Sequence, residues 1–193
     1  MSGKSELRRA LRTARREHVR ALPGSVSALI FNRPPRPLVD AIDENAVIGL
    51  YAATRYEAPA NGYARFFKEA GHTIALPHLV AASGPMVFRE YRDPFAHTDL
   101  EKGPMSIAQP PRTARLLTPR VLIVPLVGFT ARGDRLGQGG GHYDRWLAEH
   151  PGTMAVGLAW DVQLIGEGSE LTVEAHDARL DAIITPTRIY GDL

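Results

Sequence analysis

The sequence predicts an α/β fold: one domain over residues 1–193, with an open, mainly parallel sheet flanked by helices in a Rossmann-like, three-layer arrangement. Two observations predict it. Short apolar runs rich in β-branched residues alternate with segments of helical periodicity, a pattern typical of crossover connections between parallel strands. The composition, 44% hydrophobic and 23% charged, is that of a globular protein large enough to bury one core. In such a sheet, we expect a ligand crevice at the carboxyl ends of the strands.

The first predicted element is a basic helix over residues 5–21. Its apolar residues recur at helical spacing, and Pro23-Gly24 follows as a terminator. Residues 1–20 carry seven Lys and Arg against two Glu, whereas the rest of the chain carries 16 basic and 19 acidic residues. The basic sequence pI of about 9.1 is therefore a property of this one helix.

The elements that follow are predicted from local patterns. Residues 38–44 place their apolar side chains on one helical face. The continuous apolar run 46–51 fits a strand that is covered on both sides. Residues 61–70 are expected to form a helix that ends at Gly71, and residues 72–77 the next strand.

The second half of the chain continues the alternation. Residues 86–91 predict a strand with one wetter face, because apolar and polar residues alternate there. Residues 92–119 contain several Pro and Gly breaks and predict a long, irregular excursion over the surface. The apolar, β-branched run 120–126 is the strongest strand signal in the chain. The remaining predicted elements are a helix over 142–150 and strands over 153–159 and 181–185.

A glycine-rich segment, VGFTARGDRLGQGGGHYDRW over residues 127–146, follows the strongest strand and precedes a helix. Glycines let the backbone approach an anion, and the N–H groups at a helix N-terminus point partial positive charge toward phosphate. Arg135 adds a planar donor fork for phosphate oxygens, and Asp144 offers a carboxylate to a hard divalent cation. The segment therefore predicts a phosphate cradle with a magnesium ligand beside it.

Two common phosphate-binding fingerprints fail in this segment. Gly137-Gln138-Gly139 begins the dinucleotide pattern, but His142 stands where a small residue should pack. Gly128 and Gly133 have P-loop spacing, but Asp134-Arg135 replaces the required Lys and Ser/Thr. A plain glycine-rich turn, with an acidic residue capping the next helix, is the structural alternative. Six glycines within 14 residues exceed what such a turn requires, so we favour a cradle of a less common kind.

The chain contains no cysteine, which excludes disulfide scaffolds, thiolate zinc sites and cysteine nucleophiles. No run approaches the ~18 consecutive apolar residues of a membrane span, and the N-terminal residues lack the apolar stretch of a secretory signal. We therefore expect a cytoplasmic protein without membrane contact, and a monomer rather than an obligate oligomer.

Taken together, the motifs resemble those of the 5-formyltetrahydrofolate cyclo-ligase family, also called methenyltetrahydrofolate synthetases. Residues 135–144, RLGQGGGHYD, resemble the family signature Arg-Leu-Gly-x-Gly-x-Gly followed by an aromatic residue, Tyr and Asp. Residues 4–8 resemble the family's opening Lys-x-x-Leu-Arg, and residues 106–110 resemble its Ile-x-Glu/Gln-Pro segment. Glu57 follows the first strand, as the family's substrate-contacting Glu does, and residues 180–182 resemble a late strand with a metal-binding Asp.

The resemblance implies conversion of 5-formyltetrahydrofolate and ATP to 5,10-methenyltetrahydrofolate, ADP and phosphate with Mg²⁺, through phosphorylation of the formyl oxygen. The ATP-binding residues it implies are Lys4, Arg8, Arg135, Leu136, Gly137, Gln138, Gly139, Gly140, Gly141, His142 and Tyr143. The folate-binding residues it implies are Ala52, Glu57, Gln138, Gly139, Gly140, Gly141 and His142. The magnesium ligands it implies are Asp144 and Asp181. Its partners would be the reduced folate and ATP, and not nucleic acid.

The sequence departs from the family pattern at three positions. Thr130 stands where many members have Asp, His142 where Tyr or Phe is usual, and Ser106 where Gly is frequent. None of the three removes an implied phosphate or metal ligand. The departures bear on the identity of the substrate.

Two other functions are weighed against the cyclo-ligase. A related ATP-dependent enzyme could act on a non-folate formyl or amide compound with the same ATP site. A nucleic-acid-binding module could use the basic helix, but aromatic residues do not interleave with the basic run and the rest of the chain is net acidic. Lys4 and Arg8 lie one helical turn apart in this sequence, so both can face one anion, as the cyclo-ligase function requires. The other arginines are expected to form a solvated face or to meet a polyglutamate tail.

Overall fold

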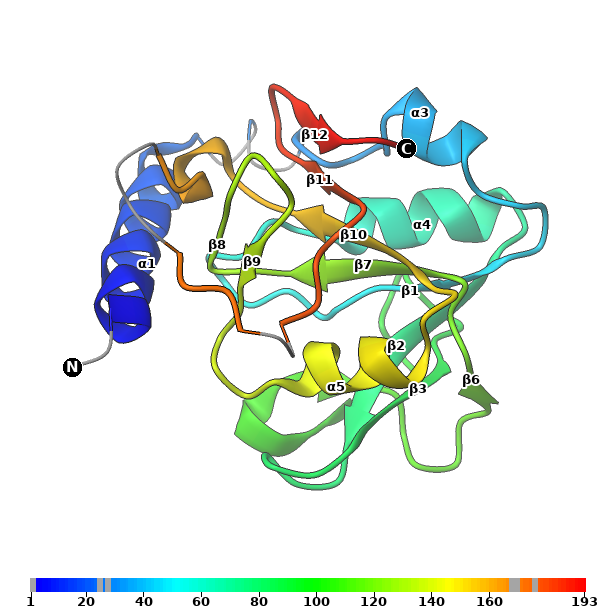
Figure 1. Cartoon of the computed structure of the whole chain (residues 1–193). Coiled ribbons are helices and arrows are strands. Elements are labelled where there is room, and N and C mark those ends of the chain that lie inside the picture. Colours follow the sequence, from blue (N-terminus) through cyan, green and yellow to red (C-terminus); the bar gives the residue numbers. More distant parts are fainter. Residues whose placement is uncertain (1–2, 24–25, 27–28, 167–170, 175–176) are drawn as a thin grey trace.

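The computed structural model describes residues 3–193 except 24–25, 27–28, 167–170 and 175–176. Its central sheet contains β1 (Val47–Gly49), β2 (Thr73–Leu79), β3 (Met86–Glu90), β6 (Leu116–Leu117), β7 (Val121–Pro125), β10 (Met154–Leu158), β11 (Ala182–Ile184) and β12 (Ile189–Gly191). The strand order is β12-β11-β10-β7-β1-β2-β3-β6 (Figure 1). The pairs from β11 through β2 are parallel, and the pairs formed by β12, β3 and β6 are antiparallel. The expected open, mainly parallel α/β sheet is confirmed.

The other elements surround this sheet. The α-helices described are α1 (Gly3–Ala21), α3 (Arg36–Asp40), α4 (Asn61–Glu69) and α5 (His142–Glu149). Two 3₁₀ turns, η1 (Pro104–Ser106) and η2 (Asp161–Gln163), and two short strand pairs, β4 (Glu101–Lys102) with β5 (Ala108–Gln109) and β8 (Gly128–Phe129) with β9 (Arg135–Leu136), complete the described fold. None of the described helices is both long and apolar enough to span a bilayer.

The sheet is buried on both faces, because successive strand residues point to opposite sides. In β7, Ile123 packs into the cluster that contains Phe67 of α4, whereas Leu122 and Val124 pack into the cluster that contains Trp146 of α5. Figure 1 shows α4 and α5 on opposite faces of the sheet. This double cover explains why the strands occur in the sequence as continuous apolar runs.

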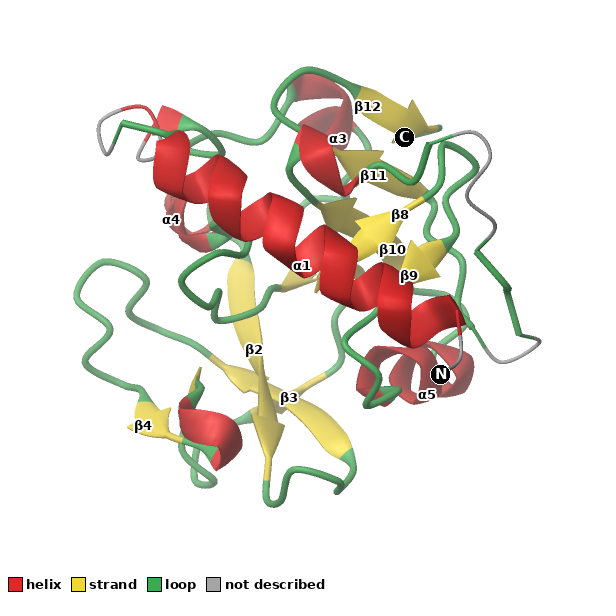
Figure 2. Ribbon diagram, turned by 90° about the vertical axis from the view of Figure 1, so that its left-hand side faces the viewer, coloured by secondary structure: helices red, strands yellow, loops and turns green. Residues whose placement is uncertain are grey.

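Helix α1 runs across the edge of the sheet where the parallel strands end, close to β8 and β9 (Figure 2). Its Leu11 packs with Val127, Leu136 and Ile165 in a small third cluster. Strand β1 lies between β2 and β7, so the chain order reverses there and leaves a topological switch point at the same edge. The helix therefore forms one wall of the region where an α/β sheet binds its ligand.

The structure differs from the predicted elements in three respects. The excursion over residues 92–119 is not structureless, since it holds β4, η1 and β5, and its β6 joins the main sheet beside β3. The glycine-rich segment contains the β8–β9 pair before its loop. Strand β12 pairs antiparallel with β11 after Pro186, where the last strand is predicted to end. Strands of two or three residues carry too little periodicity to be recognised locally.

Candidate active site

A cavity of about 700 Å³ opens at the carboxyl ends of β1, β2 and β7, where the crevice was expected. Its wall combines α1, the residues after β1, the glycine-rich loop and the segment before β11. Among the residues that line it are Lys4, Arg8, Ala52, Glu57, Arg135, Leu136, Gly137, Gln138, Gly139, Gly140, Gly141, His142, Tyr143 and Asp144. The fold therefore gathers in one cavity every predicted ATP and folate residue and one predicted metal ligand.

The glycine-rich loop leads from β9 into the N-terminus of α5. Gly139 has a φ of 105° and Gly141, the residue that caps α5, a φ of 64°, both in the left-handed region that favours glycine. A Cβ on Gly139 would lie 3.8 Å from the guanidinium carbon of Arg8. The loop thus brings backbone against a cation and places the first N–H groups of α5 beside the cavity, the geometry of an anion-binding loop.

Gly139→Ala is expected to weaken binding of the predicted ATP ligand about tenfold and to lower the free energy of unfolding by ~1–2 kcal/mol. An alanine at this positive φ is strained and would shift the loop. Titration with ATP and urea unfolding measure the two effects. Gly152→Ala is a matched control, since Gly152 has no positive φ and a methyl group there would meet only Arg120, at 3.9 Å. Equal behaviour of the two variants would contradict a role for the loop geometry.

Arg135 and Asp144 form a nearly buried ion pair inside the cavity. Nη2 of Arg135 lies 2.5 Å from Oδ1 of Asp144, with side chains 4% and 16% exposed. The backbone N–H of Ala178 donates to the same Oδ1 at 3.1 Å. Nε of Arg135 is buried without a hydrogen-bond partner among the described residues. A buried donor without a partner is costly, so this guanidinium is suited to an oxygen ligand.

Two aromatic side chains complete the loop. The Arg135 guanidinium lies over the ring of Tyr143, 5.8 Å from its centroid, and burial raises the pKa of the Tyr143 phenol. Nε2 of His142 lies 3.0 Å from the carbonyl of Ala82, in the turn between β2 and β3. The ring of His142 is therefore tied to the turn between β2 and β3.

The cations of α1 form one stripe along the helix. Lys4, Arg8, Arg12 and Arg15 are spaced by four, four and three residues, which puts them on one helical face. Nε of Arg8 donates to the Gly137 carbonyl at 2.9 Å, and Nη2 of Arg12 donates to Oε1 of Gln138 at 2.7 Å. Nη1 of Arg15 donates to the Leu126 carbonyl, just after β7. The expectation of a solvated face is therefore wrong for Arg15, which is buried, whereas Arg12 is half-buried and contacts Gln138.

Lys4 lines the cavity and pairs with two acidic residues. Its Nζ lies 2.9 Å from Oδ2 of Asp177 and 3.3 Å from Oε2 of Glu174. Hydrogen bonding to Asp177 raises the pKa of the Lys4 ammonium. Both acidic residues line the cavity, and no local pattern pointed to their role because they lie in a segment without periodicity.

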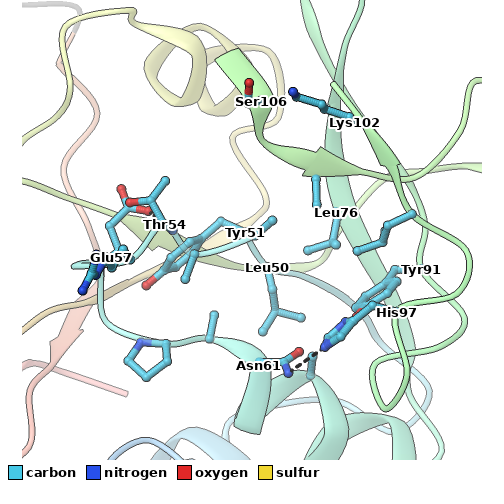
Figure 3. A pocket seen from close by; sticks show the side chains of 18 of the residues that line it. Leu50, Tyr51, Thr54, Glu57, Asn61, Leu76, Tyr91, His97, Lys102 and Ser106 are labelled. Carbon is cyan, nitrogen blue, oxygen red and sulfur yellow. Dashed lines mark hydrogen bonds between the residues drawn. The ribbon is translucent and has the colours of Figure 1, made fainter. Parts of the chain in front are cut away.

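Glu57 lines both the main cavity and a second one, of about 710 Å³, which Figure 3 shows. Tyr51, Ala52, Thr54 and Glu57 border both. Burial raises the pKa of Tyr51 well above that of a free phenol. The second cavity has apolar walls such as Leu50 and Leu76 and ends at a polar group.

That polar group consists of Tyr91, His97 and Asn61. Tyr91 Oη bonds Nδ1 of His97, and Asn61 Nδ2 lies 3.3 Å from its Nε2. Figure 3 shows this group on the side of the cavity away from Glu57. Two adjoining cavities that share one wall can hold two ligands side by side.

Asp181 lies apart from the main cavity. It precedes β11 at the amino end of that strand, and its Oδ2 accepts the backbone N–H of Ala155 at 2.7 Å. Asp144, Asp177 and Asp181 all border a further groove along α5, of about 590 Å³. Among the described residues, no group of three or more His, Asp or Glu could hold a metal ion alone. A cation at this site would need oxygen ligands from a bound anion as well.

The fold and the site define an α/β protein with a glycine-rich loop and a cavity at the sheet's switch point. A family model for the 5-formyltetrahydrofolate cyclo-ligase family matches residues 1–186, nearly the whole chain. The chain therefore belongs to the 5-formyltetrahydrofolate cyclo-ligase family and is an enzyme of that family.

Individual relatives agree with this assignment. The 5-formyltetrahydrofolate cyclo-ligase of Escherichia coli K12 is 38% identical over 128 residues, which cover 63% of this chain and 67% of the relative. A mitochondrial cyclo-ligase of Arabidopsis thaliana is 31% identical over 78 residues, 36% of this chain and 28% of the relative.

Two solved structures share the fold. The 5,10-methenyltetrahydrofolate synthetase of Aquifex aeolicus has a TM-score of 0.71 at 21% identity and covers 98% of this chain and 93% of its own. The synthetase of Mycoplasma pneumoniae has a TM-score of 0.66 at 20% identity, with coverage of 95% and 98%.

Proposed function

We propose that this protein cyclises 5-formyltetrahydrofolate to 5,10-methenyltetrahydrofolate, with Mg²⁺ and ATP, and releases ADP and phosphate. The observation that carries the proposal is the convergence of Lys4, Arg8 and Arg135 with the glycine-rich loop on a cavity that Glu57 also lines. Cations and backbone N–H groups suit the nucleotide phosphates. A carboxylate at the junction with a second cavity suits the N–H donors of a pterin ring.

The chemistry requires activation of a poor leaving group. The formyl oxygen attacks the γ-phosphorus of ATP and ADP leaves, which converts that oxygen into a phosphate ester. N10 then attacks the former formyl carbon, the bond from that carbon to the oxygen breaks with departure of phosphate, and the N10 proton is lost. Phosphoryl transfer depends on positioning and charge neutralisation more than on a protein nucleophile. Arg8 and Arg135 would bind phosphate oxygens, and the Gly139 loop would hold them in line.

The carboxylates of the cavity fit a magnesium ion that arrives with the nucleotide. Mg²⁺ is usually held by one or two carboxylates together with substrate phosphates and water, and it neutralises charge between the phosphoryl groups. Asp144 and Asp177 both line the cavity, so we propose these two as its protein ligands. The placement of Asp181, with its carboxylate on the Ala155 N–H, supports it less strongly for this role.

We further propose that residues 1–193 act as a single cytoplasmic domain and as a monomer, with small molecules and not nucleic acid as partners. The absence of cysteine suits a reducing compartment. Arg8 and Arg12 contact the glycine-rich loop at Gly137 and Gln138, which supports the assignment of small-molecule partners.

A spectrophotometric assay tests the proposed reaction. Mixing the protein with 5-formyltetrahydrofolate and MgATP is expected to produce the absorbance of the methenyl product, with one ADP per product formed. Omission of ATP, or chelation of Mg²⁺, should abolish the signal. No product at high protein concentration would overturn the proposal. If another formyl or amide compound stimulates ATP hydrolysis and the folate does not, that compound and not the folate is the phosphoryl acceptor.

A further inference from the structure

The interaction of Arg12 with Gln138 links α1 to the glycine-rich loop through two side chains. Nε and Nη2 of Arg12 lie 3.2 and 2.7 Å from Oε1 of Gln138, and Nη2 also lies 3.3 Å from the Gln138 carbonyl. A guanidinium carries only donors. The carbonyl end of the Gln138 side chain must therefore face Arg12, and its NH₂ group must face away.

The NH₂ group of Gln138 faces Glu57. Nε2 of Gln138 lies 3.2 Å from Oε1 of Glu57, and the backbone N–H of Thr54 donates to Oε2 at 2.8 Å. Each carboxylate oxygen thus has one fixed donor and retains lone pairs toward the two cavities that Glu57 borders. The Gln138 amide is thus oriented from both ends, because the Arg12 guanidinium only donates and the Glu57 carboxylate only accepts.

Arg15 supports the same carboxylate by charge. It is 6% exposed, and its Nε has no hydrogen-bond partner among the described residues. Burial lowers the pKa of the Arg15 guanidinium, and the charge of Glu57 is the largest influence that opposes this. Arg12, through Gln138, and Arg15, by its charge, therefore both act on Glu57, which lies 81 positions before Gln138 in the sequence.

We propose that Arg12 is a positioning residue that orients Glu57 through Gln138 and so sets the affinity for the folate. This rests on the proposed function, in which Glu57 contacts the pterin. Arg12 touches neither reacting group, and its effect passes through one amide whose orientation it fixes. The proposed phosphate ligands Arg8 and Arg135 bind Gly137 and Asp144 and not this amide, so the loss of Arg12 should affect the affinity for ATP less than the affinity for the folate.

Arg12→Gln tests the proposal, because a glutamine at this position can donate or accept and no longer fixes Gln138. The KM for 5-formyltetrahydrofolate is expected to rise about three- to tenfold, the range of one net hydrogen bond at a partly exposed site. The KM for ATP and kcat should change less than twofold. Arg12→Lys, which keeps donors without an acceptor, should recover part of the folate affinity. Equal changes in both KM values would overturn the proposal.

Arg9→Gln is the matched control, since Arg9 lies on α1, is exposed and loses the same charge. It should leave both KM values unchanged, so a rise equal to that of Arg12→Gln would point to helix charge and overturn the proposal. A double-mutant cycle with Gln138→Ala adds a second test. In the Gln138→Ala background, Arg12→Gln should have no further effect on the KM for the folate. Additive effects of the two substitutions would contradict an action of Arg12 through Gln138. Absence of turnover in the unmodified enzyme would instead reject the proposed function.

Discussion

Arg135→Lys is expected to lower kcat about 100- to 1,000-fold, the loss typical of removing one preorganised donor from a site of developing charge. The Arg135 guanidinium binds Asp144 with one nitrogen while its buried Nε has no partner among the described residues. A planar fork can hold the carboxylate and a phosphate oxygen together, whereas a lysine ammonium in the same space cannot. Single-turnover measurements with saturating substrates report this loss directly.

Because lysine keeps the charge beside Asp144, the thermal unfolding midpoint of this variant should stay within a few degrees of the unmodified enzyme. Arg132→Lys is its control: Arg132 is exposed in the same glycine-rich segment, and it contacts Arg179 through its backbone carbonyl, which the substitution keeps. A loss in Arg135→Lys of less than tenfold would remove Arg135 from the phosphate-binding group.

The second large effect is expected for Asp177→Asn, which should raise the Mg²⁺ concentration for half-maximal activity tenfold or more and lower kcat about 100-fold. Asp177 lines the main cavity and lies 2.9 Å from the Lys4 ammonium, and in the proposed reaction it would help to hold Mg²⁺ beside the nucleotide. Loss of its charge weakens both interactions. Titration of activity with Mg²⁺ at fixed ATP measures the change.

Asp181→Asn separates this assignment from the one that the motif implied. The Oδ1 of asparagine can still accept the Ala155 N–H, so the variant should keep the Mg²⁺ dependence and lose about 1 kcal/mol of stability. If Asp181→Asn raises the Mg²⁺ requirement and Asp177→Asn does not, Asp181 is the metal ligand and the proposed role of Asp177 fails.

Several features of the fold and the site could be predicted from sequence because their signals are local. The apolar run at 120–126 and the glycines at 137–141 each fit one physical explanation, a strand covered on both faces and a close backbone approach. The rule that ligands bind at the carboxyl ends of parallel strands then located the crevice without any contact information.

The features that were not predicted depend on contacts between distant segments. Asp177 and Asp181 lie four residues apart in a segment without periodicity, and only the fold shows that Asp177 meets Lys4 while Asp181 meets Ala155. Arg12 and Arg15 have the sequence pattern of other surface arginines, and only the packing of the loop after β9 and the end of β7 against α1 distinguishes them. Strand β6 was not predicted within residues 92–119, because pairing with β3 specifies this two-residue edge strand and its own sequence does not.

The ion pair between Lys4 and Asp177 joins residues 173 positions apart. A contact of this separation closes one of the largest loops available to the chain, and the entropy of that closure must be overcome before the contact contributes. The binding cavity is therefore complete only after the whole sheet has formed, and the end of α1 that carries Lys4 can detach while the sheet stays folded. Under mild denaturation, enzymatic activity should thus be lost before the sheet unfolds. Residual secondary structure is therefore a poor measure of the fraction of active molecules.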